Sequence, residues 1–212
     1  TLRENLLAYL KAEFTVGAVD ISTSAYYHEN EGRGDWVPPY LVDVKDDGAE
    51  GHSELVNGNT VYGGSALGNI YFVDRDGMQL SPIAGCASSI TFPYGGAGAE
   101  YDPSCHEQGA IPVGSYRHTH YNKERIGFNA DGIWYAKLGE FDNTLRFGLW
   151  WEDYERDEYR DWHKITDSAI GYDFNNSPYW VQYDRSFPVD TLMYYVEDEI
   201  DFGVAKVRLG AK

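Results

Sequence analysis

Residues 109–134, GAIPVGSYRHTHYNKERIGFNADGIW, hold the most informative pattern of chemical groups in the chain. His118 and His120 lie two positions apart at its centre. In a strand over Val113–His120, successive side chains alternate between faces, so both imidazoles point the same way and can reach one ion. Asp131 follows His120 after ten intervening residues. Two imidazoles, one carboxylate and an open fourth position are typical of hydrolytic zinc sites. The stretch therefore predicts Zn²⁺ bound by His118, His120 and Asp131.

This spacing resembles that of the JAMM (JAB/MPN) zinc metallopeptidase family. The segment GNIYFVDRDG at 68–77, followed by a loop and VGSYRHTHYN, is similar to an uncharacterised JAB-like domain attached to RHS-repeat polymorphic toxins. The resemblance covers Ser65 to Asp131 and implies zinc-dependent hydrolysis of peptide or isopeptide bonds by a secreted toxin or effector domain. Two positions depart from the family pattern, because Ser65 stands at the catalytic glutamate and Phe128 at the serine.

Glu54 is the remaining candidate for a general base. It lies well upstream of His118, as the family glutamate does, and would take the proton of a metal-bound water. The alternative is a solvent-exposed loop carboxylate without a catalytic role.

Cys86 and Cys105 bracket the glycine-rich segment 92–101, and this arrangement predicts a disulfide that closes the loop. The alternative is two reduced thiols, one of which would serve a cysteine hydrolase with a histidine. A disulfide and the many tyrosines and tryptophans favour a secreted or extracellular protein.

Composition limits the classes of partner. Seventeen basic against thirty-four acidic residues give a formal net charge of −17, which repels nucleic acid. No window approaches the ~20 continuous apolar residues of a membrane span, so none is expected. With 212 residues, of which 42% are hydrophobic, we expect a single domain over 1–212. Its JAMM-like part covers about 54–138 and an aromatic-rich extension about 139–212.

The periodicity of the chain predicts an α+β fold. Leu2, Leu6, Leu7, Leu10 and Phe14 recur at helical spacing, so we expect a helix over 2–14 that packs on a mixed, mostly antiparallel sheet. The His-x-His strand should lie near the centre of this sheet. We also expect a strand over 16–27, a loop over 28–36, and further strands at 40–45, 69–73, 133–138 and 204–209.

The segment 144–162 carries aromatic residues among alternating charges and fits either a helix or a charged hairpin. Exposed tyrosine and tryptophan rings stack on sugars, so a glycan is a possible partner beside a protein or peptide substrate. The alternative function is therefore a non-catalytic protein- or glycan-binding module on a degenerate JAMM-like scaffold.

Overall fold

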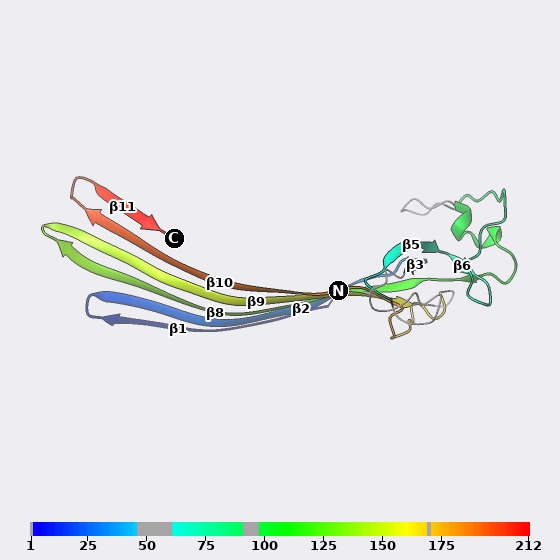
Figure 1. Cartoon of the computed structure of the whole chain (residues 1–212), viewed down its shortest axis with the longest axis horizontal. Helices are drawn as coiled ribbons and strands as arrows, with labels where there is room; N and C mark the ends of the chain where they lie inside the picture. The colour runs from blue at the N-terminus through cyan, green and yellow to red at the C-terminus, as the bar shows by residue number, and fades with distance from the viewer. Residues whose placement is uncertain (1, 46–60, 91–97, 169–170) are drawn as a thin grey trace. The chain divides into compact units, whose positions relative to one another are not determined.

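The computed structural model describes residues 2–45, 61–90, 98–168 and 171–212 (Figure 1). These residues form strands and two short 3-10 helices. The largest sheet has the strand order β1-β2-β8-β9-β10-β11, with β4 pairing in parallel with β10. Its members are β1 (Leu2–Val16), β2 (Val19–Trp36), β4 (Val61–Tyr62), β8 (Ser115–Leu138), β9 (Phe141–Lys164), β10 (Trp180–Asp201) and β11 (Lys206–Ala211).

The fold is all-β, so the predicted α+β, JAMM-like arrangement is wrong. Residues 2–14 lie in strand β1 instead of a helix, and no α-helix occurs in the described part of the chain. The reason is that a spacing of four is close to one helical turn and is also a multiple of the strand period of two. Leu2, Leu6, Leu10 and Phe14 therefore share one face of a strand.

Two further expectations about the elements are wrong. Residues 28–36, expected as a loop, continue strand β2 to Trp36. Residues 144–162, expected as a helix or a hairpin, belong to the single strand β9. In both segments charged side chains alternate with others along a sheet whose side chains are largely in contact with solvent, so their polarity does not interrupt the strand.

Contacts within the chain group its residues into two compact units. Unit 1 consists of residues 1–2, 33–120 and 158–185, and unit 2 of residues 3–32, 121–157 and 186–212. Strands β1, β2, β8, β9 and β10 contribute residues to both, β1 with Leu2 alone in unit 1. The expected single domain stays a prediction.

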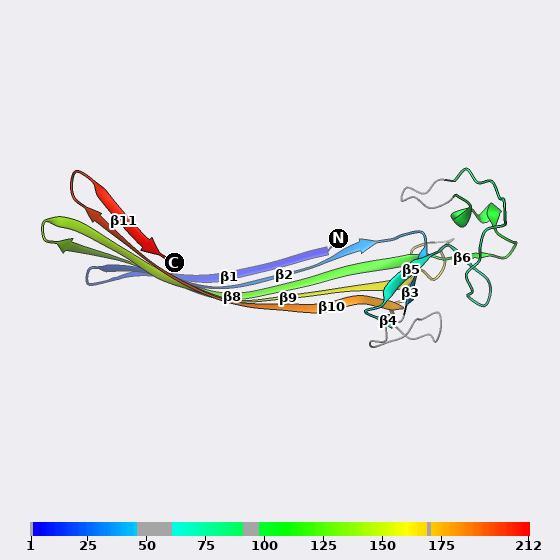
Figure 2. The ribbon, with the colours of Figure 1, turned by 45° about the horizontal axis from the view of Figure 1, so that its top comes forward.

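Unit 2 is a single layer of antiparallel strands joined by tight turns. Its strands lie side by side in both views, and no other described element of unit 2 covers them (Figures 1 and 2). Gly17, Gly139 and Gly203 occupy the turns with φ of 64°, 65° and 79°, a conformation that glycine adopts without strain.

None of the described helices is long and apolar enough to cross a membrane.

Unit 1 contains the hydrophobic core. The short antiparallel sheet of β3 (Leu41–Lys45) and β5 (Ser65–Ile70) supplies its aliphatic residues. Trp162 stacks on Trp180 with ring centroids 5.5 Å apart, which adds the ends of β9 and β10 to this core. Both residues of β6 (Phe72–Val73), which pairs with the exposed strand β7 (Ile111–Pro112), complete it.

The predicted disulfide between Cys86 and Cys105 is confirmed in unit 1, with Cα atoms 5.6 Å apart. It lies beside the 3-10 helices η1 (Gly98–Tyr101) and η2 (Pro103–Cys105). Since both thiols are bonded, the cysteine-hydrolase alternative loses its nucleophile.

Candidate metal centre

The candidate site lies on two neighbouring strands of unit 1, β8 and β9. Side chains two positions apart in a strand share a face, so His118 and His120 project together from β8. Asp161 and His163 project together from β9 by the same rule. The two pairs meet, because both histidines of β8 contact the carboxylate of Asp161.

The spacing of the ligand atoms suits a small cation. Nδ1 of His118 and Nε2 of His120 each lie 3.5 Å from Oδ1 of Asp161, and Nε2 of His163 lies 3.0 Å from Oδ2. One ligand atom each from His118, Asp161 and His163 lie within 4.8 Å of one another. Tetrahedral ligands ~2.0–2.1 Å from a zinc ion are about 3.3 Å apart. The group could therefore hold a metal ion after side-chain shifts of about 1 Å.

The ring of His163 is oriented by a backbone carbonyl. Its Nδ1 lies 2.7 Å from the carbonyl oxygen of Asn175, and because this oxygen only accepts, Nδ1 carries the hydrogen. Nε2 then faces Asp161 either with a second proton or with a lone pair directed at a cation. An N–H donated to a backbone carbonyl is the usual support of a metal-binding histidine.

Burial and neighbouring charges together shift the pKa of His118, His120 and Asp161. His118 and His163 expose only 6% and 4% of their surface. Burial lowers the pKa of His118 and of His120, although the nearby Asp161 carboxylate partly offsets it. Burial by itself would raise the pKa of Asp161, but the His163 hydrogen bond and the charges of the imidazoles outweigh it and lower that pKa. Neutral imidazoles and an ionised carboxylate are the forms that bind metals.

Several buried polar atoms of the site lack a hydrogen-bond partner among the described residues. They are Oδ1 of Asp161, Nε2 of His120 and Nε2 of His118. The 3.5 Å contact between Asp161 and His120 is too long for a strong hydrogen bond. A buried polar atom without a partner costs about 1–3 kcal/mol. A cation between these side chains would give Asp161 and His120 the partner that they lack, so the residues fit a metal ion.

Aromatic rings cover the site within unit 1. Phe174 stacks on Tyr116 at 4.4 Å and meets His118 and His163 edge to face, each with ring centroids 5.3 Å apart. Tyr159 stacks on His120 with centroids 3.9 Å apart and planes 9° apart. These contacts fix the imidazole rings and lower the local polarity, which strengthens any charge interaction at the site.

The structure brings together only part of the predicted ligand set. His118 and His120 lie together as expected, but Asp131 belongs to unit 2, where its Oδ1 accepts a hydrogen bond from Tyr195. The carboxylate beside the histidines is Asp161. Glu54, the predicted general base, lies outside the described residues.

Asp161 and His163 were missed in the sequence, although a signal was present. Asp161-Trp-His163 repeats the spacing of His118-Thr-His120, with two possible ligands on one face of a strand. The intervening Trp162 packs in the core, on the opposite face of β9. Pairs of this type in two strands joined by a tight turn predict a shared site once the strand pairing is known.

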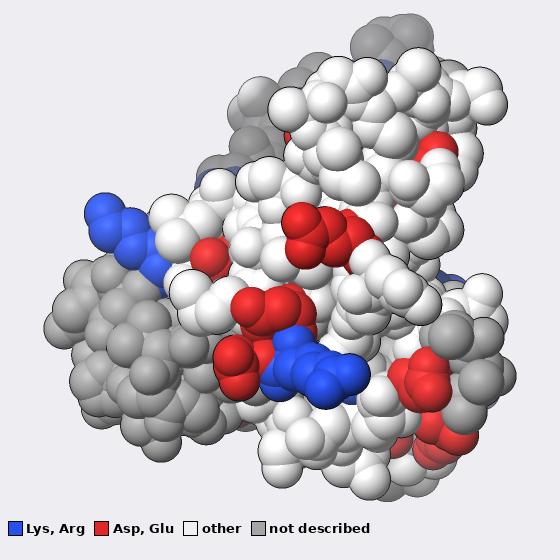
Figure 3. Space-filling view, turned by 90° about the vertical axis from the view of Figure 1, so that its right-hand side faces the viewer, with Lys and Arg blue, Asp and Glu red and all other residues white. Residues whose placement is uncertain are grey.

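The net charge of the chain does not gather in one region of the face drawn in Figure 3. The acidic side chains on that face form small groups between uncharged residues.

Searches of family models, curated proteins and solved structures found no match to this chain. The resemblance to the JAMM family therefore stays a prediction.

Proposed function

We propose that this protein binds a divalent transition-metal ion, Zn²⁺ in preference, through His118, Asp161 and His163, with His120 as the fourth ligand. The observation that carries the proposal is the convergence of the first three within 4.8 Å around a carboxylate oxygen that lacks a hydrogen bond. Imidazole nitrogens with one carboxylate suit zinc, whereas Ca²⁺ and Mg²⁺ prefer oxygen ligands.

A structural role for the metal fits these residues best. Four protein ligands leave no position for water, and closed coordination is typical of zinc that stabilises a fold. The ion would fasten β8 to β9 where both strands belong to unit 1. The Cys86–Cys105 disulfide supports a location outside the reducing cytoplasm for this activity.

Calorimetric titration of chelator-treated protein with Zn²⁺ tests the site. We expect about one ion per chain for the wild type, and no binding by Asp161→Asn or His163→Ala, because each loses a ligand that the others cannot replace. His28→Ala is the matched control, since His28 lies in unit 2 and bonds to Asn5. Equal affinity in the wild type and in His163→Ala would disprove the proposal.

Hydrolysis of peptide or isopeptide bonds is the alternative use of the same ion. It requires a water ligand in place of His120, which the metal would activate. The pH dependence of the visible spectrum of the Co²⁺-loaded protein separates the two uses, because a water ligand ionises at about pH 7 and four protein ligands leave none to ionise. If the zinc-loaded wild type cleaves a peptide library and Asp161→Asn does not, the hydrolase replaces the structural role.

A further inference from the structure

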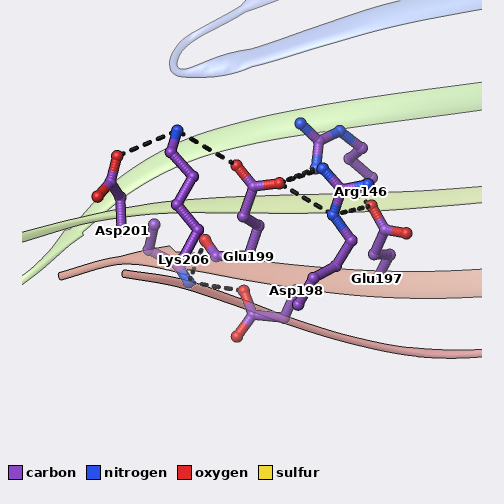
Figure 4. A network of polar contacts seen from close by, with 8 residues as sticks. Arg146, Glu197, Asp198, Glu199, Asp201 and Lys206 are labelled. Carbon is purple, nitrogen blue, oxygen red and sulfur yellow. Dashed lines mark hydrogen bonds and ion pairs between the residues drawn. The ribbon is translucent and has the colours of Figure 1, made fainter. Parts of the chain in front are cut away.

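The two faces of the unit 2 sheet differ in chemistry. One face, here called the polar face, carries hydrogen bonds and ion pairs between strands. Figure 4 shows its charged network across β9, β10 and β11, where Arg146 and Lys206 contact Glu197, Glu199 and Asp201. Arg208 of β11 also contacts Glu197 and Glu199. Tyr26 of β2 continues it by donating to Glu152 of β9 at 2.6 Å.

The other face, here called the apolar face, is formed by the alternate positions of the same strands. Large hydrophobic side chains are exposed on this face of five strands: Leu10 on β1, Trp134 on β8, Leu149 on β9, Leu192 on β10 and Leu209 on β11. No described element of unit 2 covers them (Figure 2). Exposed apolar patches of this extent mark a surface that binds something apolar.

The alternation is unbroken along β1, which allows each residue to be assigned to a face. Asn5 bonds to His28 and Thr15 bonds to Asp20, so odd-numbered residues at both ends of β1 lie on the polar face. Leu10 is therefore on the apolar face and Tyr9 on the polar face.

On β1 and β8 the length of the uncharged band matches a bilayer. On β1 the side chains of the apolar face from residue 6 to 16 are Leu, Ala, Leu, Ala, Phe and Val. On β8 those from 126 to 138 are Ile, Phe, Ala, Gly, Trp, Ala and Leu. A tilted strand crosses the ~30 Å hydrocarbon layer with about 9–11 residues.

Charge bounds the band at one end. The next residues on the apolar face are acidic on five strands: Glu4, Glu29, Glu124, Asp153 and Asp190. At the turn end the polar pair Asn143 and Asp198 is satisfied internally, with a hydrogen bond of 2.6 Å. An uncharged strip with charge beyond it has the polarity profile of a bilayer, hydrocarbon inside and head groups outside.

We infer that the apolar face of unit 2 contacts the hydrocarbon of a lipid bilayer. A protein partner fits less well, because protein interfaces carry about one hydrogen bond per 100–200 Å² and the band offers almost no groups to make them. Acyl chains require none. The acidic rim favours zwitterionic over anionic head groups, since like charges repel.

Vesicle flotation with the full 212-residue chain tests the inference, using vesicles of phosphatidylcholine alone. Leu10→Arg places a charge on the apolar face of the sheet. Tyr9→Arg, at the adjacent residue, places the same charge on the polar face. The two side chains are almost equally exposed, at 75% and 73%, so neither change should disturb packing. We expect Leu10→Arg to reduce vesicle binding at least about tenfold and Tyr9→Arg to leave it within about twofold.

Depth of insertion provides an independent readout. Trp151 and Trp150 are neighbours on opposite faces, and Trp150 donates to Tyr26 on the polar face. Lipids brominated in the acyl chain should quench the fluorescence of the wild type, and Trp151→Phe should reduce the quenched fraction more than Trp150→Phe does. Absence of flotation by the wild type would overturn the inference. So would self-association without lipid that Leu10→Arg abolishes, because the face would then bind a second copy.

Discussion

Two carboxylates of unit 1, the buried Asp102 and the half-buried Asp161, differ in how they are satisfied. Asp102 accepts hydrogen bonds from the hydroxyls of Ser88 and Ser104, at 2.5 and 2.6 Å, and from the Ser104 amide at 2.9 Å. Oδ1 of Asp161 accepts none from the described residues and faces imidazole nitrogens instead. A saturated carboxylate stabilises the local backbone, whereas an unsaturated one needs a cation. Asp102 is therefore structural, and Asp161 is the carboxylate of the group that could hold a metal ion.

Asp102→Asn should destabilise the protein in a pH-dependent way. Hydrogen bonds from Ser104 and Ser88 lower the pKa of Asp102. The stabilisation is therefore present above the unfolded pKa of about 3.9, and it is lost as the pH falls through the lower folded pKa. Denaturant midpoints of wild type and variant should differ at pH 7 and converge as the pH falls through the lowered folded pKa of Asp102. Exposed Asp76→Asn is the control, and a difference that persists unchanged at low pH would contradict the assignment.

The sequence predicted half of the candidate site, and the limit is geometric. His118 and His120 are two apart and share a face in any strand. Asp131 lies eleven positions after His120, and an odd offset in an unbroken strand places a side chain on the opposite face. The family spacing assumes that the chain turns between these residues. Asp161, the carboxylate that lies beside the two histidines, comes from the next strand and is brought in by the pairing of β8 with β9.

At the scale of the elements, a recurring arrangement ties the strands of unit 2 together. A tyrosine crosses over a glycine of the neighbouring strand and bonds to a polar residue on the strand beyond. Tyr26 crosses Gly127 to reach Glu152, and the same geometry joins Tyr121 over Gly32 to Arg3, and Tyr195 over Gly148 to Asp131. Each ring replaces the side chain that glycine lacks, which compensates for the weak strand propensity of glycine.

Gly127→Ala should therefore destabilise unit 2 by about 1–3 kcal/mol, the usual cost of overpacking. A Cβ at this position would lie 2.2 Å from Cζ of Tyr26, so the ring must move and its bond to Glu152 must break. Denaturant unfolding measures the effect. Gly34→Ala is the control, because a Cβ there meets no atom within 4 Å. Equal midpoints for the two variants would show that the ring does not rest on Gly127.

The disulfide should matter for unit 1. Cys86 and Cys105 are 19 positions apart, and closing a loop of this size stabilises a fold by about 3 kcal/mol. The double variant Cys86→Ser with Cys105→Ser should lower the free energy of unfolding by about this amount. Reductant should lower the free energy of unfolding of the wild type by a similar amount and leave that of the double variant unchanged. A response of the double variant to reductant would point to a different origin.

Sequence patterns predicted several strands of this fold, but they wrongly predicted a helix over residues 2–14 and did not reveal the chemistry of its surfaces. Most strand predictions depend on one buried face, but every residue of β1 is exposed, so burial gave no signal to separate a strand from a helix. A search for continuous apolar runs also does not register a face on which only alternate residues are apolar. The charge-free band from Ile126 to Leu138 is visible only after the residues of β8 are separated by face.

At the scale of the whole molecule, β8 and β9 carry the proposed metal ligands in unit 1 and then continue into unit 2. Opening β8 away from β9 at the site would separate His118 from Asp161. A ligand bound there opposes this opening by RT ln(1 + [L]/Kd), which is about 2.7 kcal/mol at 100 times Kd. Regions that open without breaking the site gain no protection from the ligand, because hydrogen exchange reports the local free energy of opening.

Hydrogen exchange with and without Zn²⁺ should therefore give a local pattern. Amides of residues 116–120 and 161–164 that exchange through this opening should slow by about 100-fold at 100 times Kd. Amides of β10 and β11 around the Gly203 turn should exchange at unchanged rates, since that hairpin holds no ligand. Asp161→Asn with Zn²⁺ is the control and should show no protection at either place. Uniform slowing along the whole chain, or slowing that persists in Asp161→Asn, would mean that the ion acts elsewhere than between β8 and β9.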